Sequence, residues 1–357
     1  CCGWPARSYG CAAGAGLSVI EIASQVSLQD YNTLALPACA EYFCSVTSEQ
    51  QIAQALDYAR THNLQVTALG GGSNLLLAGD IAGLVIYLDL SGINCVDSCK
   101  DSVTIEFAAG ENWHKAIEYC LQQGWYGLEN LSLIPGNIGA APIQNIGAYG
   151  VELCDLFVSL RAINIATGEV LIMDRQACEF GYRDSIFKHK YSNCYLITQV
   201  SLELWAQPQV NLQYPALAEA LAAESEPTPE MVSAAVCAIR SAKLPDPAQI
   251  PNAGSFFKNP MVDAEQLKSL LADNPKMPFY SADNGWSKVP AAWLIDQSGF
   301  RGLRSGNVGV HRDQALVLVN FGGTGAELLA LANRIQSEVL ERFAIALEIE
   351  PRIYGQS

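Results

Sequence analysis

The sequence predicts an α+β protein of two or three domains. Its 357 residues are 50% apolar and only 16% charged, a composition that can bury more than one core. Segments with helical and with strand periodicity follow one another without a repeated strand–helix unit, which disfavours a doubly wound sheet. The segment 129–152 is apolar but contains four glycines and two prolines, so it fits neither a regular helix nor a regular strand.

Charge and cysteine content exclude several classes of protein. The formal net charge of -15 argues against nucleic-acid or anionic-membrane binding. The twelve cysteines include no CxxC pair and the four histidines no metal-spaced set, so we expect no metal site. Free buried cysteines in a reducing cytosol are the simplest interpretation, and no apolar run reaches the roughly 20 residues that span a bilayer. We therefore expect a cytoplasmic protein, with residues 1–27 as a leader outside the fold.

The first half of the chain contains signals for both helices and strands. Ser48, or Thr47 before it, can cap a helix with Gln51 or Gln50 as the capping-box partner. The expected elements, in chain order, are a short helix within 17–28, the capped helix with Ile52, Leu56 and Ala59 on its apolar face, strands over 65–69, 84–88 and 103–108, and a helix over 112–123.

The second half continues in the same mixed pattern. Thr167 and Gly168 separate two strand-like runs, which predicts a β-hairpin. A polar stretch over 222–230 with two prolines predicts a loop. The expected strands are 158–165, 169–173, 195–205, 315–320 and 346–353, and the expected helices are 231–242, 264–272, 291–297 and 326–343.

Two glycine-rich segments are the best candidates for a ligand site. A buried loop such as 129–152 must satisfy its backbone amides, and a large ligand such as a dinucleotide would do so. The other segment directly follows a predicted strand and consists of Gly70, Gly71, Gly72, Ser73 and Asn74. It is neither a G-x-G-x-x-G fingerprint nor a Walker loop, and alone it is more often a tight turn. Together the two segments predict a phosphate cradle.

Three polar motifs have both a chemical and a structural interpretation. Arg183 in GYRDSIFK can bind a carboxylate, although a surface pair with Asp184 is slightly favoured. Ser255 in NAGSFFKNP can donate a proton in a dry pocket, although capping a turn is the commoner role. In a final strand Glu348 and Glu350 would share a face, either solvated or with one raised pKa.

These motifs occur in a recognisable combination. The chain contains, in one order from about residue 30 to its end, GGGSNLL, GLENLSLIPGNIGAAPIQNIGAYGVE, FGYRDSIFK, KLPDP, NAGSFFKNP, AAWLID, VHRDQALVLVN and LEIEPR. In this combination it resembles the UDP-N-acetylenolpyruvoylglucosamine reductases of bacterial peptidoglycan synthesis, of the type with a mobile Tyr-bearing loop.

The resemblance implies a domain order. A two-part FAD-binding domain of the vanillyl-alcohol-oxidase/PCMH type would occupy 28–205. A substrate-binding α+β region that includes the Tyr loop would occupy 206–350. The tail, 351–357, would return to the FAD domain.

The resemblance also implies an activity. The chain would be an FAD-dependent, NADP-linked oxidoreductase that reduces UDP-N-acetylenolpyruvoylglucosamine to UDP-N-acetylmuramate. FAD would carry a hydride from NADPH to the vinyl methylene of the enolpyruvyl group, and an enzyme acid would protonate the adjacent carbon. The implied partner is a UDP-sugar, with no nucleic acid, membrane insertion or metal, in a monomer or weak oligomer.

Residue roles follow from the same resemblance. Arg183 would hold the charge of the developing enolate, Ser255 would donate the proton, and Glu350 would polarise the enolate carboxylate or relay the proton. The residues assigned to the substrate are Tyr182, Tyr214, Lys243 and Asn259. The residues assigned to FAD are Gly70, Gly71, Gly72, Ser73, Asn74, Glu129, Ile134, Pro135, Gly136, Gly139, Ala140, Ala141, Gln144, Asn145, Gly147 and Ala148.

The chain departs from the family pattern at two places. Leu34 and Ala35 stand where the family has Phe and Gly near the flavin entrance, which affects local packing and not the reaction class. Tyr214 matches the tyrosine of the mobile loop in a segment of different spacing. Two alternatives stay open: another FAD-linked oxidoreductase of the same superfamily, or a non-catalytic flavin or nucleotide-sugar binder.

Overall fold

A four-stranded sheet begins the fold in the computed structural model, which describes residues 20–282 and 285–355. Its order is β1-β2-β5-β3; β2, β5 and β3 are parallel and β1 is antiparallel to β2. The Ser48 side chain accepts the Gln51 N–H, which confirms the predicted start of the first helix. The bounds are β1 (Ala23–Ser27), β2 (Cys39–Val46), α1 (Glu49–Thr61), β3 (Val66–Leu69) and β5 (Ile81–Leu88).

The predicted helix within 17–28 is wrong where the structure describes it. Ala23–Ser27 is an edge strand paired with β2, from Ala23 opposite Phe43 to Ser27 opposite Cys39. The apolar spacing was a local signal, and pairing with a distant strand overrides it. Residues 17–19 of that prediction lie outside the described residues.

A second sheet is antiparallel throughout, in the order β11-β10-β12-β7-β6. The predicted hairpin at Thr167 and Gly168 is confirmed, because β10 pairs with β11 across it. Trp113 and Ile117 of α2 are buried with Phe107 in one core. The bounds are β6 (Ile93–Ser98), β7 (Ser102–Ala108), α2 (Trp113–Gln123), β10 (Phe157–Asn164), β11 (Val170–Asp174) and β12 (Tyr195–Trp205).

The 129–152 segment forms short irregular elements, as its glycines and prolines predicted. Ile138 and Ala141 anchor it in the core of the second sheet. Its elements and the helix after it are η2 (Glu129–Leu131), η3 (Ile138–Gln144), β8 (Gly147–Ala148), β9 (Val151–Glu152) and α3 (Leu153–Leu156).

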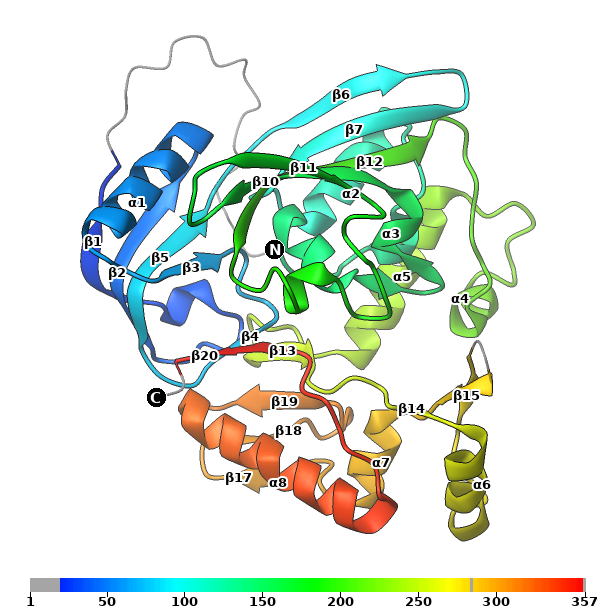
Figure 1. The fold of residues 1–357 in the computed structure, drawn as a ribbon. Helices are drawn as coiled ribbons and strands as arrows, with labels where there is room; N and C mark the ends of the chain where they lie inside the picture. Colours follow the sequence, from blue (N-terminus) through cyan, green and yellow to red (C-terminus); the bar gives the residue numbers. More distant parts are fainter. Residues whose placement is uncertain (1–19, 283–284, 356–357) are drawn as a thin grey trace.

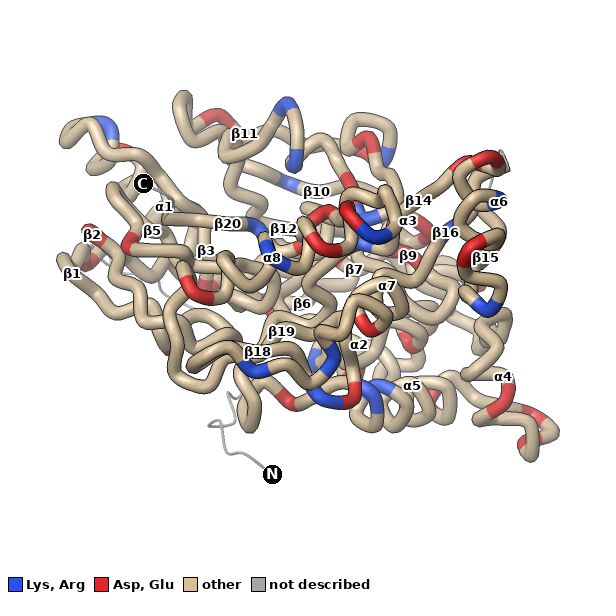
Figure 2. The backbone as a smooth tube through the Cα atoms, turned by 90° about the horizontal axis from the view of Figure 1, so that it is seen from below, with Lys and Arg blue, Asp and Glu red and all other residues tan. Residues whose placement is uncertain are grey.

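The C-terminal part is built on the antiparallel sheet β13-β19-β18-β17, with α8 across it (Figure 1). A smaller sheet, β14-β16-β15, lies with α6 at one corner of the molecule (Figures 1 and 2). The bounds are α4 (Pro215–Ala220), α5 (Pro229–Lys243), β13 (Asn252–Ser255), β14 (Met261–Val262), α6 (Ala264–Asp273), β15 (Tyr280–Ser281), β16 (Ser287–Lys288), α7 (Ala291–Gln297), β17 (Arg304–Ser305), β18 (Val308–Val310), β19 (Val317–Asn320) and α8 (Gly325–Phe343).

Two cores fix the segments that carry the candidate residues. Phe256 is buried with Val85 of the first sheet, so the C-terminal sheet and the first sheet share one core. Phe187, beside the Arg183 motif, is buried in the core of the second sheet.

Acidic and basic positions are intermixed along the chain (Figure 2). Within the described ranges, no helix has both the length and the apolar character needed to cross a bilayer.

The chain ends by returning to its N-terminal part. β20 (Arg352–Tyr354) runs parallel to β4 (Leu75–Leu77), as Figure 1 shows. The predicted strand over 346–353 is therefore correct only at its end. Before β20 the chain makes one isolated bridge, between Ile349 and Phe257.

Candidate functional site

The two glycine-rich segments lie against each other. Ser73 Oγ donates to the Pro135 carbonyl at 3.0 Å, and Asn74 Nδ2 donates to Gln144 Oε1 at 2.6 Å. The structure thus brings the 70–74 loop and the 129–152 segment, which are distant in sequence, to the same place.

Two glycines of the 70–74 loop have no room for a side chain. A Cβ on Gly71 would lie 2.8 Å from Asn137 Oδ1 and 3.1 Å from Gly136 Cα. A Cβ on Gly72 would overlap the Tyr31 carbonyl, and its φ of +62° is left-handed. Glycine therefore lets the backbone of the loop lie close to residues 136–137 at Gly71 and to residues 31–32 at Gly72.

The 70–74 loop also has the hydrogen-bond donors that a pyrophosphate requires. Within residues 20–282 and 285–355, no acceptor receives the backbone N–H groups of Gly71, Gly72, Ser73 and Asn74. Successive free N–H groups in a turn form a concave anion site. The loop and the facing segment therefore fit a dinucleotide such as FAD.

One buried polar atom in the 129–152 segment, Asn130 Oδ1, and one beside it, Arg240 Nε, lack a partner among the described residues. Helix α5, which carries Arg240, packs on the segment through Ser233, whose Oγ lies 2.8 Å from Ser132 Oγ. Burial lowers the pKa of Arg240. Buried polar groups are normally hydrogen-bonded, so these two atoms are suited to ligand contacts. Sequence reasoning missed Arg240, because a single helical arginine carries no motif.

Some predicted FAD residues use their side chains within the chain. Glu129 is 1% exposed, its Oε2 accepts the Gly127 N–H at 2.7 Å, and burial raises its pKa. Asn145 is fully buried, and its Nδ2 donates to Glu152 Oε2 at 2.8 Å and to the Gly181 carbonyl at 3.1 Å. These two side chains set the shape of the segment.

Arg183 lies in a closed turn against this segment. Gly181 and Asp184 exchange backbone hydrogen bonds of 3.1 and 3.2 Å, and Arg183 between them has a φ of +53°. Its Nη2 donates to the Gly147 carbonyl at 2.6 Å. The favoured pairing of Arg183 with Asp184 is wrong, because Asp184 instead contacts His189 at 2.7 Å. The turn therefore directs the guanidinium to the cradle and away from the surface.

Ser255 and Glu350 lie on adjacent extended segments. The Glu350 N–H donates to the Phe256 carbonyl at 2.9 Å, next to Ser255. Glu350 Oε1 lies 3.6 Å from Arg183 Nε. Ser255 Oγ has no hydrogen-bond partner in the part of the chain that the structure describes. Glu350 therefore lies between Arg183 and the strand that carries Ser255, and the three residues come from segments distant in sequence.

The two terminal glutamates differ in burial, and of the two predicted alternatives the raised pKa of one carboxyl holds for Glu350. Glu348 is 67% exposed and pairs with Lys258 Nζ at 2.5 Å, whereas Glu350 is only 12% exposed. The bridge between Phe257 and Ile349 positions both glutamates, and this long-range contact is not visible in the local sequence pattern.

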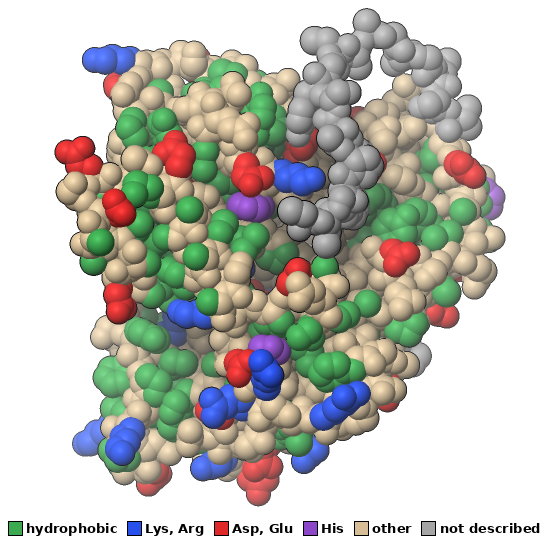
Figure 3. All heavy atoms as spheres, turned by 180° about the vertical axis from the view of Figure 1, so that it is seen from behind, with side chains coloured by type: hydrophobic (Ala, Val, Ile, Leu, Met, Phe, Trp, Pro, Cys, Tyr) green, Lys and Arg blue, Asp and Glu red, His purple; other side chains and the backbone are tan. Residues whose placement is uncertain are grey.

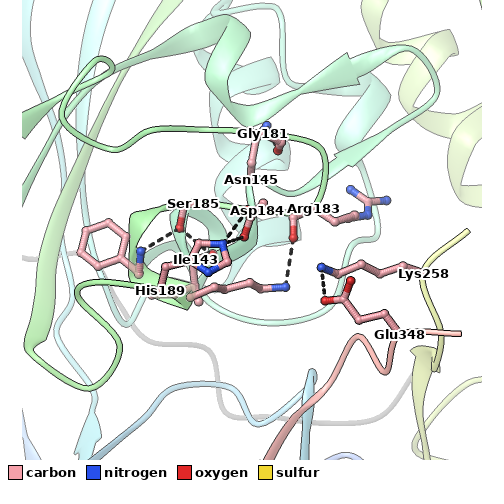
Figure 4. A network of polar contacts seen from close by, with 11 residues as sticks. Ile143, Asn145, Gly181, Arg183, Asp184, Ser185, His189, Lys258 and Glu348 are labelled. Atoms are coloured by element: carbon pink, nitrogen blue, oxygen red, sulfur yellow. Dashed lines mark hydrogen bonds and ion pairs between the residues drawn. The ribbon is translucent and has the colours of Figure 1, made fainter. Parts of the chain in front are cut away.

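Three cations act on the buried Glu350 carboxyl: Arg183, Lys188 and Lys258. Figure 4 shows two of them, Arg183 and Lys258, with Lys258 paired with Glu348. Burial raises the pKa of Glu350, although Arg183, Lys188 and Lys258 act to lower it. Lys188 Nζ donates to the Arg183 carbonyl at 3.0 Å, and burial followed by repulsion from Lys258 lowers the Lys188 pKa. In an acidic chain this local excess of positive charge favours an anionic substrate.

Tyr182 and Asn259 lie beside this cluster. Asn259 Oδ1 accepts the Ala291 N–H at the start of α7 at 2.9 Å, and its side chain also bonds Tyr182. Lys288 Nζ lies 3.8 Å from the centroid of the Tyr182 ring. Sequence reasoning found the first two residues and missed Lys188 and Lys288.

The other two predicted substrate residues do not contact the cluster in the described chain. Lys243 is the exposed last residue of α5, and Tyr214 is 40% exposed with its ring 5.0 Å from that of Tyr149.

The face opposite that of Figure 1 is hollowed between its upper and lower parts (Figure 3). Among the described residues, no group of three His, Cys, Asp or Glu could hold a metal ion.

Two parts of the chain match known protein families. Residues 40–174 match an FAD binding domain. Residues 246–354 match the C-terminal domain of UDP-N-acetylenolpyruvoylglucosamine reductase.

Individual proteins match over nearly the full length. UDP-N-acetylenolpyruvoylglucosamine reductase of Pseudomonas syringae pv. syringae is 45% identical over 339 residues, and that of Pseudomonas aeruginosa is 47% identical over 338 residues. Each match covers 94% of this chain and 99% of the relative. The crystal structure of UDP-N-acetylenolpyruvylglucosamine reductase from Thermus caldophilus gives a TM-score of 0.66 at 23% identity, covering 94% of this chain and 99% of that one. The predicted α+β fold, an FAD-binding domain followed by a second domain, is confirmed.

Proposed function

This chain belongs to the UDP-N-acetylenolpyruvoylglucosamine reductase family, whose members are FAD-dependent oxidoreductases, and we propose how its residues carry out the reaction. The substrate is the enolpyruvyl ether of UDP-N-acetylglucosamine, the reductant is NADPH, and the product is UDP-N-acetylmuramate. The observation that carries the proposal is the position of Glu350 beside the cradle, between Arg183 and the strand that carries Ser255.

The 70–74 loop and the 129–152 segment would hold the cofactor between them. The free N–H groups of Gly71, Gly72, Ser73 and Asn74 would bind its pyrophosphate. Bound FAD supplies hydride transfer from NADPH to the vinyl methylene of the substrate. We keep the expected domains, 28–205 for FAD, 206–350 for the substrate and 351–357 as the returning tail, with one change. The expected leader 1–27 is wrong at its end, because the strand β1 (Ala23–Ser27) belongs to the first sheet, so the FAD domain includes it.

Arg183 holds the substrate carboxylate. Hydride addition to the methylene places negative charge on the carbon next to the carboxylate and on the carboxylate itself. A preorganised cation at that position stabilises the charge as it develops. The hydrogen bond from Arg183 to the Gly147 carbonyl and the bond from Lys188 to the Arg183 carbonyl fix its position.

Ser255 donates the proton to the carbon that bears the carboxylate. A serine hydroxyl is a weak acid, so it needs a strongly basic carbon and close geometry. Its Oγ proton has no acceptor among the described residues, which leaves it available. Glu350, with its raised pKa, hydrogen-bonds the enolate carboxylate or relays a proton toward Ser255.

A turnover assay tests the proposal. The purified protein should show the visible spectrum of bound flavin and oxidise NADPH rapidly only when UDP-N-acetylenolpyruvoylglucosamine is present. NADPH oxidation that does not depend on the nucleotide would instead favour another oxidoreductase of the superfamily. A flavin spectrum without turnover would favour a non-catalytic binder.

A further inference from the structure

Leu133 has an unusual backbone conformation directly before the part of the cradle assigned to FAD. Its φ is +59°, in the left-handed region that is unfavourable for a bulky residue unless other interactions hold it there. Ile134 and Pro135 follow it in the chain, and the Pro135 carbonyl accepts the Ser73 hydroxyl at 3.0 Å. The conformation of Leu133 therefore sets how this segment approaches the 70–74 loop.

The first turn of α2 holds the same stretch in place. The Trp113 indole Nε1 donates to the Leu131 carbonyl at 2.9 Å, and the Trp113 N–H donates to the Gly136 carbonyl at 3.0 Å. Between these two bonds the Leu133 N–H donates to Nδ1 of His114 at 3.1 Å. The amide of the strained residue is therefore held by an imidazole nitrogen, which can accept this bond only when it carries no proton.

This bond fixes both the tautomer and the charge of His114. With Nδ1 unprotonated, the neutral ring carries its proton on Nε2, which lies 3.9 Å from Cys237 Sγ on α5. A protonated ring would carry a hydrogen on Nδ1 as well, and that hydrogen would oppose the Leu133 N–H. Protonation of His114 therefore removes the acceptor that the Leu133 amide uses.

The surroundings of His114 favour the neutral ring. Burial lowers the pKa of His114, Glu118 Oε1 at 3.8 Å from Nε2 raises it, and the guanidinium of Arg240 lowers it, with a decrease as the net result. A cation in the first turn of a helix is also unfavourable. Burial raises the pKa of the neighbouring Cys237, so its thiol is uncharged, and the facing stretch 131–136 contains no charged residue. The bond to the amide is therefore intact at neutral pH.

We propose that neutral His114 is a positioning residue for cofactor binding, which holds Leu133 in the conformation that shapes the cradle and makes FAD affinity depend on pH. The inference rests on the proposed assignment of FAD to the cradle. When the ring is protonated, or its Nδ1 is removed, Leu133 relaxes from its left-handed conformation. FAD then binds more weakly, because it must restore the conformation of residues 133–135.

The affinity of the full-length protein for FAD, measured as a function of pH, tests the proposal. A dilution series of the FAD-loaded protein, in which flavin fluorescence reports the released cofactor, gives the Kd from about pH 8 to about pH 5.5. The wild-type Kd should rise about fivefold as the pH falls below 6.5, the ordinary pKa of histidine. Above that pH it should be constant.

Two substitutions of His114 separate its hydrogen bond from its bulk. His114→Asn keeps an acceptor near the position of Nδ1 but does not titrate, so its Kd should match wild type at pH 8 and stay nearly constant at lower pH. His114→Leu fills the space without an acceptor, so its Kd should be about tenfold above wild type at pH 8 and equally insensitive to pH. His62→Asn, at an exposed histidine at the end of α1, is the control and should keep the wild-type profile.

Three outcomes would overturn the assignment. The first is a wild-type Kd that does not change with pH. The second is the wild-type pH profile in His114→Asn, which would assign the dependence to FAD itself or to another group. The third is a wild-type Kd in His114→Leu at every pH. If His114→Leu does not fold, the comparison of wild type with His114→Asn still decides, because the asparagine retains the acceptor.

Failure here differs from failure of the reductase function. If only His114 is misassigned, the wild type binds FAD and oxidises NADPH when the enolpyruvyl nucleotide is present, and its FAD affinity does not depend on this residue. If the function is misassigned, the wild type lacks nucleotide-dependent NADPH oxidation at every pH.

Discussion

Gly70 and Gly72 belong to the same loop, yet alanine at Gly70 should weaken cofactor binding, whereas alanine at Gly72 should lower the stability of the fold. A Cβ on Gly70 would meet no atom closer than Asn137 Cβ at 4.0 Å, so the chain itself gives no reason for glycine there. The fold of Gly70→Ala should therefore be as stable as wild type to within about 0.5 kcal/mol. If the reason for glycine is close approach of FAD, the added methyl group should weaken cofactor binding at least about tenfold, or roughly 1.4 kcal/mol.

Gly72→Ala should instead damage the fold. The new Cβ would overlap the Tyr31 carbonyl, and the φ of +62° is unfavourable for alanine. Left-handed strain of about 1–2 kcal/mol and overpacking of about 1–3 kcal/mol suggest a loss of roughly 2–5 kcal/mol in the free energy of unfolding.

Two measurements separate these effects. Urea unfolding of the cofactor-free proteins gives the stabilities, and titration of the same proteins with FAD gives the affinities. Wild-type FAD affinity in Gly70→Ala would refute the idea that the 70–74 loop contacts the cofactor. Wild-type stability in Gly72→Ala would refute the packing that the structure shows.

Three further predictions concern single side chains. Lys188→Met removes the hydrogen bond to the Arg183 carbonyl and should slow nucleotide-dependent turnover about tenfold with FAD retained. Lys188→Gln, which keeps an N–H donor, should recover much of the rate. Equal turnover rates in Lys188→Met and wild type would contradict the positioning role. Ala35 has a left-handed φ of 49°, so Ala35→Gly should raise stability by roughly 0.5–1 kcal/mol in thermal unfolding, and a lower Tm would contradict this. Burial raises the pKa of Glu350 above its ordinary 4.5, so the folded chain retains a proton that the unfolded chain releases. Stability should therefore fall as pH rises from about 4.5 through the raised pKa, and Glu350→Gln should remove that part of the fall; an identical pH profile in both proteins would argue against it.

Local patterns in the sequence predicted the elements that depend on local signals. The strand 195–205 and the helix 291–297 have the predicted bounds, because each has its periodicity and its end signals within a few residues. The edge strand Ala23–Ser27 was missed, because only its pairing with β2 makes it a strand.

The candidate site likewise contains residues that local sequence patterns predict and residues that they do not. The glycine-rich segments were found from composition, because close backbone approach requires glycine. The different surroundings of Glu348 and Glu350 were not predictable, because the bridge between Phe257 and Ile349 sets them. The roles of Arg183 and Ser255 came from resemblance, since neither residue type specifies its chemistry alone. Lys188 and Lys288 depend on burial and on distant neighbours, which the sequence does not display.

The central claim is that Ser255 donates the proton in a site that Arg183 and Glu350 complete. The most direct measurement compares wild type and Ser255→Ala under anaerobic conditions in two separate half-reactions. The rate of flavin reduction by NADPH should be nearly the same in both proteins. Reoxidation of the reduced protein by the enolpyruvyl nucleotide should be slowed by at least about a hundredfold in Ser255→Ala. Reoxidation at the wild-type rate, or equal loss of both half-reactions, would contradict the assignment.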